Sequence, residues 1–294
     1  MPLTPIGRMM EHAQHGKYAI GYFESSNLES LQGVIDAAEA VRAPVIIGFN
    51  GEFLSQRFGG RPSELALYGM LGKTAAAQAS VPCGLIFNEC AEDVWVEEAI
   101  TAGFNLVMPA DPAATLADYT RRVARLAALA HSNGVAIEAE IDELPSGGGK
   151  HHGGKASDPQ VAAEFVAATR VDLLAVSVGN EHIKLNGRAP LDLALLESLH
   201  SCVRVPLVLH GGTGIDDASL RAAIGLGVLK VNYGTYIKQR YLEAVRPVLS
   251  STELNPHAIV GGPSENDIMV IGRRAVRDAV LERIEILGCC GKAA

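Results

Sequence analysis

The sequence has few cysteines and no long apolar run. Its 294 residues include five cysteines without a CxxC spacing, which argues against a disulfide framework or a zinc ribbon and suits a reducing compartment. No apolar stretch approaches the roughly 20 residues that span a bilayer, and residues 1–5 lack a basic segment followed by an apolar run. We therefore expect a soluble, cytoplasmic protein in which Cys289 and Cys290 are exposed and unpaired.

An excess of positive charge is also absent. The net charge is −8 at pH 7 and the isoelectric point is about 5.6, which argues against non-specific nucleic-acid binding but leaves room for a basic pocket that binds a small anion. The hydrophobic content of 48% and the mean hydropathy of +0.17 are enough for one large core or two modest ones.

Short apolar runs alternate with longer segments of helical period, which is the pattern of repeated βα units. The runs expected to form strands are residues 19–23, 44–49, 82–88, 106–108, 135–141, 173–177, 206–210 and 228–232. The segments expected to form helices between them are residues 28–41, 64–79, 94–102, 116–132, 159–169, 191–200 and 217–226. Eight βα repeats in a chain of this length predict a closed parallel barrel of the α/β class, the (β/α)8 or TIM-barrel fold.

Capping residues mark the ends of these helices. Those expected at N-caps are Asn27, Ser157-Asp158 and Asp216, and those expected to end helices are Gly103, Gly134 and Gly227. After the eighth strand, residues 236–249 and 265–287 predict further helices that cap the barrel or mediate dimerisation. Because no linker divides the chain, we expect a single domain over residues 1–294.

One low-complexity segment, residues 146–155, follows the fifth strand and contains glycine, lysine and histidine. It is either a surface connection or a lid that carries Lys or His to an anionic substrate.

A histidine at a strand end is the first candidate for a functional residue. Residues 207–214 read Leu-Val-Leu-His-Gly-Gly-Thr-Gly, so a buried strand ends on His210 and turns into a glycine loop. His210 is either the last strand residue before a turn or part of a site in which an imidazole and backbone N–H groups hold a metal and an anionic oxygen.

The other strand ends of the predicted barrel also present polar residues. They are Glu24, Asn50, Asn88-Glu89, Glu138, Glu140, Glu181-His182 and Asn232. Active sites of such barrels lie at the carboxyl ends of the strands. Two imidazoles, His182 and His210, with one carboxylate from another strand would form an open divalent-metal site.

These residues resemble the class II fructose-bisphosphate and tagatose-bisphosphate aldolases, which are metal-dependent (β/α)8 barrels. The resemblance runs from about Gly21 to Tyr241. It is most specific in four segments. Residues 138–140 look like the acidic pair of the family's fifth strand, and residues 174–182 look like the histidine segment of its sixth. Residues 206–215 look like the His-Gly-Gly segment of its seventh strand, and residues 230–235 look like the phosphate and substrate segment of its eighth.

The resemblance implies that His182 and His210 bind a divalent metal, Zn²⁺ in the first place, with Mn²⁺, Co²⁺ or Fe²⁺ as alternatives. It implies a site for a substrate phosphate bordered by Gly179, Lys184, Gly211, Gly212, Thr213, Asn232 and Thr235. It also implies a small sugar or sugar-phosphate substrate and a homo-oligomer, either a dimer or a tetramer. Neither a nucleic acid nor a membrane is expected as a partner.

The sequence departs from the family pattern at the third strand, where the family has Asp-His and this chain has Asn88-Glu89. Glu89 can still bind the metal, which gives a site of two histidines and one carboxylate. Asn88 can orient a hydroxyl group but cannot accept its proton. Glu24 stands where the family commonly has Asn, and the family's phosphate-binding Lys beyond His182 is replaced by Asn186, with Lys184 two positions earlier.

Three hypotheses for the function remain. The first is an aldolase-like lyase that acts on a ketose phosphate or a related hydroxy-keto compound, with Glu24, Glu140 or a residue of the 146–155 segment (His151 or His152) moving the proton that the missing Asp would move. The second is a metal-dependent sugar-phosphate isomerase or epimerase, favoured by Asn88 and by the surplus carboxylates. The third is a non-catalytic sugar-phosphate binding protein on the same barrel.

Overall fold

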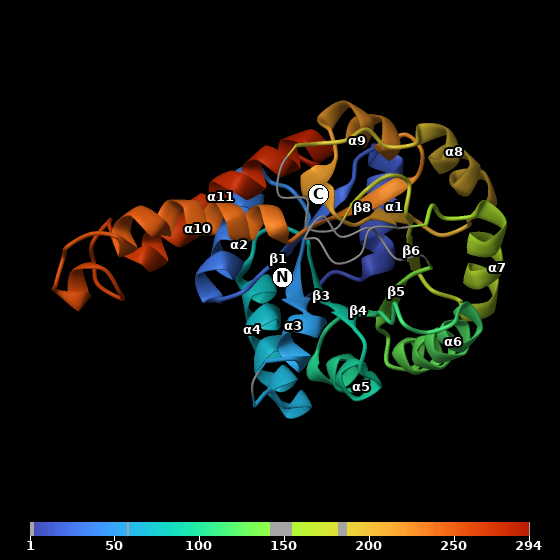
Figure 1. The fold of residues 1–294 in the computed structure, drawn as a ribbon, viewed down its shortest axis with the longest axis horizontal. Helices are drawn as coiled ribbons and strands as arrows, with labels where there is room; N and C mark the ends of the chain where they lie inside the picture. The colour runs from blue at the N-terminus through green and yellow to red at the C-terminus, as the bar shows by residue number, and fades with distance from the viewer. Residues whose placement is uncertain (1–2, 58, 142–154, 182–186, 294) are drawn as a thin grey trace.

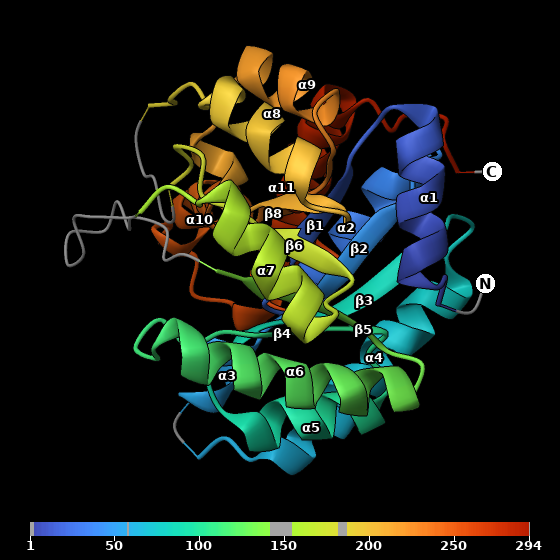
Figure 2. The same cartoon turned by 90° about the vertical axis from the view of Figure 1, so that its right-hand side faces the viewer.

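The centre of the fold is a closed barrel of eight parallel strands, with β8 paired back to β1 (Figures 1 and 2). The structure is a computed structural model that describes residues 3–57, 59–141, 155–181 and 187–293. The strands are β1 (Ile20–Glu24), β2 (Val45–Asn50), β3 (Cys83–Cys90), β4 (Leu106–Pro109), β5 (Ala136–Glu140), β6 (Leu173–Ala175), β7 (Leu207–Leu209) and β8 (Val228–Tyr233). The expected (β/α)8 barrel is confirmed, and each expected strand overlaps an observed one.

Amphipathic helices surround the barrel and bury their apolar sides against the strands. They are α2 (Leu28–Ala40), α4 (Leu65–Gln78), α5 (Asp93–Ala102), α6 (Leu116–Ser132), α7 (Pro159–Thr169), α8 (Leu193–Cys202) and α9 (Asp217–Ile224). The predicted N-caps are confirmed, because Asn27, Asp158 and Asp216 each accept a hydrogen bond from a backbone N–H of the first turn. Gly103 ends α5 in the left-handed region with φ = 105°.

Within the described residues, two α-helices were not expected from the sequence. The first, α1 (Ile6–Gly16), buries Ile6, Met9, Met10 and Ala13, and a Cβ built on Gly84 at the start of β3 would lie 2.7 Å from Ile6 Cδ1. The helix therefore packs on the amino-terminal side of the barrel. Its apolar residues follow a helical spacing, which was the available signal. The second, α3 (Gly51–Ser55), is a single turn that directly follows β2.

Two long helices, α10 (Thr235–Leu249) and α11 (Ile268–Leu287), follow the last strand as predicted. Figure 1 shows them side by side, extending beyond the barrel with their connecting segment at the far end. Helix α11 packs tightly on α2, because a Cβ on Gly33 would lie 2.6 Å from Arg273 O. We call residues 249–268 the arm tip.

The five cysteines are free thiols. Cys290 is exposed as expected, but the expectation for Cys289 is wrong. Its side chain is buried, because the chain after α11 turns back onto the barrel, where Ala293 N donates to Arg42 O at 2.8 Å. Burial raises the pKa of the Cys289 thiol to about 12. In the described parts of the chain, no helix has both the length and the apolar character needed to cross a membrane. The single domain over residues 1–294 stays a prediction, which one calorimetric transition would test.

Candidate active site

His210 lies at the carboxyl end of β7 with its imidazole between two carboxylates from other strands. Its side chain is buried, with 1% exposed. Nε2 lies 2.9 Å from Oε1 of Glu138 on β5, and Nδ1 lies 2.9 Å from Oε1 of Glu89 on β3. Asn180, after β6, donates from Nδ2 to the His210 carbonyl at 3.1 Å. Because the two carboxylates that contact the ring come from different strands, the barrel itself fixes the orientation of the ring.

These carboxylates control the charge of His210. Burial alone would lower the pKa of the imidazole, but Glu138, Glu89 and Glu140 outweigh it and raise the pKa to about 10. Glu140 contributes from a longer range, with Oε2 3.9 Å from His210 Nδ1. The three carboxylates therefore favour the protonated form of the ring.

Glu138 connects His210 to a buried lysine across the barrel. Its Oε2 lies 2.8 Å from Nζ of Lys230 on β8, and both side chains are fully buried. Lys230 Nζ also donates to Asn232 Oδ1 at 2.6 Å. Burial would raise the pKa of Glu138, but Lys230 and His210 hold it below its usual value, whereas burial lowers the pKa of Lys230 despite Glu138. A lysine in the middle of a buried apolar strand was the sequence signal for this pair, and it was missed.

Glu89 adopts an uncommon backbone conformation that directs it toward the site. Its φ is +55°, a region that non-glycine residues rarely adopt, and the pairing of β3 with β4 shifts register between Phe87 and Cys90. Asn50 at the end of β2 donates from Nδ2 to Glu89 Oε2 at 3.0 Å. A locally strained backbone at a strand end is a common feature of functional sites.

Asn50 and Asn88 are register partners at the ends of β2 and β3 and lie beside Glu89. Asn50 Oδ1 accepts the Phe53 N–H at 3.0 Å and so caps α3. Asn88 Oδ1 accepts a hydrogen bond from Asn232 Nδ2 at 3.5 Å, across the barrel from β8 to β3. The structure therefore brings together the expected residues of strands two, three and eight.

Glu24 at the end of β1 belongs to the same cluster of acids. Burial raises the pKa of Tyr22 well above its usual value, and the charges of Glu24, Glu89 and Glu138 add to this effect. The Glu24 carboxylate is nearly buried and lies 2.5 Å from Lys238 Nζ on the first turns of α10. Lys238 was not expected from the sequence, because nothing in its neighbourhood marks it as different from a solvated lysine.

The glycine loop after His210 packs closely on its neighbours. Gly211 has φ = +65° and forms the left-handed turn, and a Cβ there would lie 2.0 Å from Glu181 O. Gly212 lies against Tyr233 at the end of β8. Thr213 Oγ1 accepts the N–H of Tyr236 at 3.1 Å, which connects the loop to α10 where it begins at Thr235. Gly179, with φ = +98°, forms the neighbouring turn after β6.

Several expected residues lie outside the described part of the chain. They are His182 and Lys184, and the 146–155 segment except Lys155.

Part of the donor set suits a divalent metal ion. Glu138 at His210 Nε2 is the arrangement in which a carboxylate orients a metal-binding imidazole, and Nδ1 then faces Glu89 and, further away, Glu140. Within residues 3–57, 59–141, 155–181 and 187–293, however, no three His, Cys, Asp or Glu side chains are arranged to hold an ion. His210 and Glu89 therefore fit as two ligands of a site that needs a further one.

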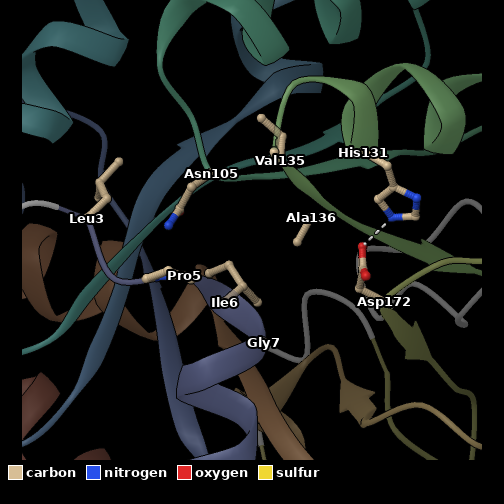
Figure 3. A pocket seen from close by; sticks show the side chains of 10 residues that line it. Leu3, Pro5, Ile6, Gly7, Asn105, His131, Val135, Ala136 and Asp172 are labelled. Atoms are coloured by element: carbon tan, nitrogen blue, oxygen red, sulfur yellow. Dashed lines mark hydrogen bonds and ion pairs between the residues drawn. The ribbon is translucent and has the colours of Figure 1, made fainter.

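A cavity of about 390 Å³ lies at the opposite, amino-terminal side of the barrel (Figure 3). His131 Nε2 is 2.9 Å from Asp172 Oδ2, which also accepts the Ile137 N–H. Asn105 accepts the Leu85 N–H and donates to Thr4 O. The polar side chains of this cavity are thus engaged in holding loops and strands together.

Comparison with known proteins agrees with the architecture. The family model described as fructose-bisphosphate aldolase class-II matches residues 4–292. A fructose-bisphosphate aldolase of Geobacillus stearothermophilus is 31% identical over 301 aligned positions and a probable fructose-bisphosphate aldolase of Bacillus subtilis is 30% identical over 304, each with full coverage of both chains. The crystal structure of the YdjI aldolase of Escherichia coli K12 superposes with a TM-score of 0.80 at 32% identity, covering 99% of this chain and 100% of the other. The chain belongs to the class II fructose-bisphosphate aldolase family, which consists of lyases of the aldolase kind.

Proposed function

We propose that this protein is a metal-dependent, aldolase-like lyase that cleaves or forms a C–C bond in a ketose phosphate or a related hydroxy-keto compound. The observation that supports this most is the imidazole of His210, buried between Glu138 and Glu89 where the barrel strands end. The ligands would be His182, His210 and Glu89, and the ion Zn²⁺, with Mn²⁺, Co²⁺ or Fe²⁺ as alternatives. When bound, such an ion polarises a carbonyl and stabilises enediolate charge.

The residues around His210 would position the substrate and move its proton. Asn88 orients the substrate hydroxyl through its amide but cannot take the proton. Glu140 is the better placed candidate for the proton shuttle, because its carboxylate is part-exposed and lies 3.9 Å from His210 Nδ1. Glu24 is the alternative, although Lys238 already neutralises it.

The substrate phosphate would bind between the loops after β6, β7 and β8. The residues proposed to contact it are Gly179, Lys184, Gly211, Gly212, Thr213, Asn232 and Thr235. Backbone N–H groups of a glycine turn next to the start of a helix favour an anion, and the connection from Thr213 to Tyr236 places the glycine turn beside α10.

Metal analysis is the first experiment. The purified protein should contain about one divalent ion per chain, and a His210→Ala variant should lose it. A protein without stoichiometric metal, or a His210→Ala variant with unchanged metal content, would reject this proposal. Incubation of candidate ketose phosphates in D₂O then separates the chemistries, since cleavage releases an aldehyde.

Asn88 favours a second candidate, a metal-dependent isomerase or epimerase. Without a base at this position to take the hydroxyl proton for C–C cleavage, the enediolate would instead form by loss of a carbon-bound proton to a carboxylate such as Glu140. That carboxylate would then return a proton to carbon. Deuterium incorporation without aldehyde release would support this alternative. Phosphate-ester binding with neither exchange nor cleavage would support a non-catalytic sugar-phosphate binding protein.

We also propose that the protein acts in the cytoplasm as a homo-oligomer, a dimer or a tetramer. Five free thiols suit a reducing compartment. The arm tip exposes the apolar side chains of Leu249, Leu254 and Val260, and exposed apolar groups gathered on a projecting element are typical of an interface. Light scattering measures the mass in solution, and a monomer at every concentration would contradict the oligomer.

A further inference from the structure

Arg122 on α6 connects the carboxyl ends of two neighbouring strands. Its side chain is largely buried, with 13% exposed. Nη2 donates to the carbonyl of Ala91 at 2.7 Å and to that of Cys90 at 3.3 Å, where β3 ends. Nη1 donates to the carbonyl of Ala110 at 3.1 Å, directly after β4. One guanidinium therefore holds the turn after β3 against the turn after β4.

The turn that Arg122 holds begins at Glu89. The two carbonyls bound by Nη2 belong to the first and second residues after Glu89, which itself has φ = +55°. A non-glycine residue in this conformation persists only where its surroundings fix it. The pairing of β3 with β4 gives little restraint here, because its register shifts between Phe87 and Cys90. The contacts of Arg122 with the next two carbonyls supply such a restraint.

Acidic partners fix the guanidinium in turn. Its Nε donates to Asp93, the first residue of α5, and Nη1 lies 3.8 Å from Asp111 Oδ2. All three nitrogens of the planar group are thus engaged, and their fixed geometry matches acceptors after both strands. Arg125, on the same helix, pairs with Asp93 as well and with Glu97 at 2.6 Å, and is 50% exposed. Arg125 has the same charge and shares a partner, so it provides a matched control.

The direction of the Glu89 carboxylate depends on this turn. Oε1 lies 2.9 Å from His210 Nδ1, and Oε2 accepts a hydrogen bond from Asn50 Nδ2 at 3.0 Å. Relaxation of φ to the extended region would turn the Cα–Cβ bond of Glu89 and move the carboxylate away from both contacts.

We propose that Arg122 is a positioning residue that holds Glu89 in the backbone conformation from which its carboxylate reaches His210. The inference rests on the proposed function, because it takes Glu89 and His210 as ligands of the same divalent ion. Arg122 acts through the main chain after β3 and thereby fixes the ligand geometry before the ion binds.

Zinc affinity, measured by competition with a chromophoric chelator, tests the inference. Arg122→Met should weaken Zn²⁺ binding by about 10- to 100-fold, the range typical of losing a group that orients a metal ligand. Arg122→Lys should fall between the wild type and Arg122→Met, since it keeps the charge but not the planar fork. Arg125→Met should bind Zn²⁺ as tightly as the wild type. Equal affinities in the wild type and Arg122→Met, or equal losses in Arg122→Met and Arg125→Met, would overturn the inference.

A double-mutant cycle with Glu89 separates positioning from a general loss of stability. In a Glu89→Gln background, Arg122→Met should cost no further zinc affinity, because the ligand that it positions is gone. The absorption spectrum of the Co²⁺-loaded protein should change in Arg122→Met and not in Arg125→Met, because it reports the ligand geometry. A loss of affinity that is as large without Glu89 as with it would contradict positioning. Circular dichroism establishes that each variant is folded.

The conformation of Glu89 in the metal-free protein keeps the two proposals separate. Its φ, measured from NMR couplings, should be positive in the wild type and Arg125→Met and negative in Arg122→Met. A protein that binds no metal but shows this change in φ would reject the proposed function and retain the role of Arg122. Aldol cleavage by a metal-loaded enzyme whose zinc affinity and Glu89 conformation are indifferent to Arg122 would do the reverse.

Discussion

Glu138 Oε2 and Lys230 Nζ lie 2.8 Å apart across the barrel, with both side chains excluded from solvent. Removing one partner leaves a buried, uncompensated charge, so Lys230→Met should lower the free energy of unfolding by about 3–5 kcal/mol. Urea denaturation measures this change.

The double variant Lys230→Met/Glu138→Gln should recover part of the loss, because the orphaned charge is gone. Arg240→Met removes an exposed pair with Glu282 and should cost less than about 1 kcal/mol. Equal losses of unfolding free energy in Lys230→Met and Arg240→Met would show that breaking the buried pair costs no more than breaking an exposed one.

The left-handed turn at Gly211 should not accept a side chain. Both Gly211 and Gly134 have positive φ, at 65° and 70°, but a Cβ at Gly211 would lie 2.0 Å from Glu181 O whereas one at Gly134 has nothing within 4 Å. Gly134→Ala should therefore cost only the conformational strain, about 1–2 kcal/mol. Gly211→Ala should cost clearly more and weaken phosphate binding. Thermal unfolding of the two variants measures this comparison. Equal decreases in Tm would contradict the steric clash expected at Gly211.

The N-cap of α9 should make stability depend on pH in the acid range. The backbone N–H of Ser219, followed by its side chain, lowers the pKa of Asp216 from 3.8. The stabilisation is therefore present above that value and is lost as the pH falls through the lower pKa of the folded state. The difference in Tm between the wild type and Asp216→Ala should be constant from about pH 5 to 8 and should shrink below about pH 4.

Asn27→Ala removes an uncharged N-cap of α2 and serves as the control for this titration. The difference in Tm between the wild type and Asn27→Ala should not change with pH. If this difference shrinks at low pH in both variants, the acid effect comes from another group.

Asn88→Asp should raise aldol cleavage of a fructose or tagatose bisphosphate. The aspartate supplies a proton acceptor beside Glu89, and a positioned base contributes about 100-fold or more to such a step. Coupled assays of aldehyde release measure the gain. Asn50→Asp changes the residue that donates to Glu89 and should give no comparable increase. An inactive Asn88→Asp enzyme would indicate that the substrate pocket differs from that of the family.

Leu254→Asp should weaken the proposed homo-oligomer and so lower its mass in solution. Leu254 lies in the arm tip and is 94% exposed, while Leu67 on α4, outside the arm tip, is 67% exposed. A charge in an apolar contact between copies is costly because it loses its water. Light scattering should therefore show a smaller oligomer mass for Leu254→Asp and an unchanged mass for Leu67→Asp. A smaller mass for Leu67→Asp alone would place the interface at α4 instead.

The strands and helices of the barrel could be predicted because each βα unit carries its own signal. The apolar runs are uninterrupted, and Asn27, Asp158 and Asp216 mark helix starts with local chemistry that needs no tertiary contact. Helix α1 was missed because its eleven residues precede the first βα unit, so the repeating pattern does not support their helical spacing. The burial of Cys289 depends on where the end of the chain returns to the barrel, which no local pattern specifies.

The candidate site could be predicted as a set of residues but not as a set of contacts. His210, Glu89 and Asn232 were identified from their places at strand ends. That Glu138 would lie between His210 and Lys230 depends on strand register and on side-chain direction across the barrel. The Glu24–Lys238 pair depends on the angle at which α10 leaves β8, and a single sequence carries no information about that angle.

Asn50 makes the first turn of α3 a reporter of what happens at Glu89. One end of its amide accepts the Phe53 N–H and the other donates to Glu89, so any ligand that draws Glu89 away removes half of the support of the Asn50 side chain. Hydrogen exchange at the Phe53 amide, which donates to Asn50 Oδ1, should then become faster. The Phe53 ring, whose centroid lies 4.1 Å from Lys238 Nζ, would become more mobile together with this turn. A ligand that binds at Glu89 could therefore be detected through the amide of Phe53 on the neighbouring helix α3.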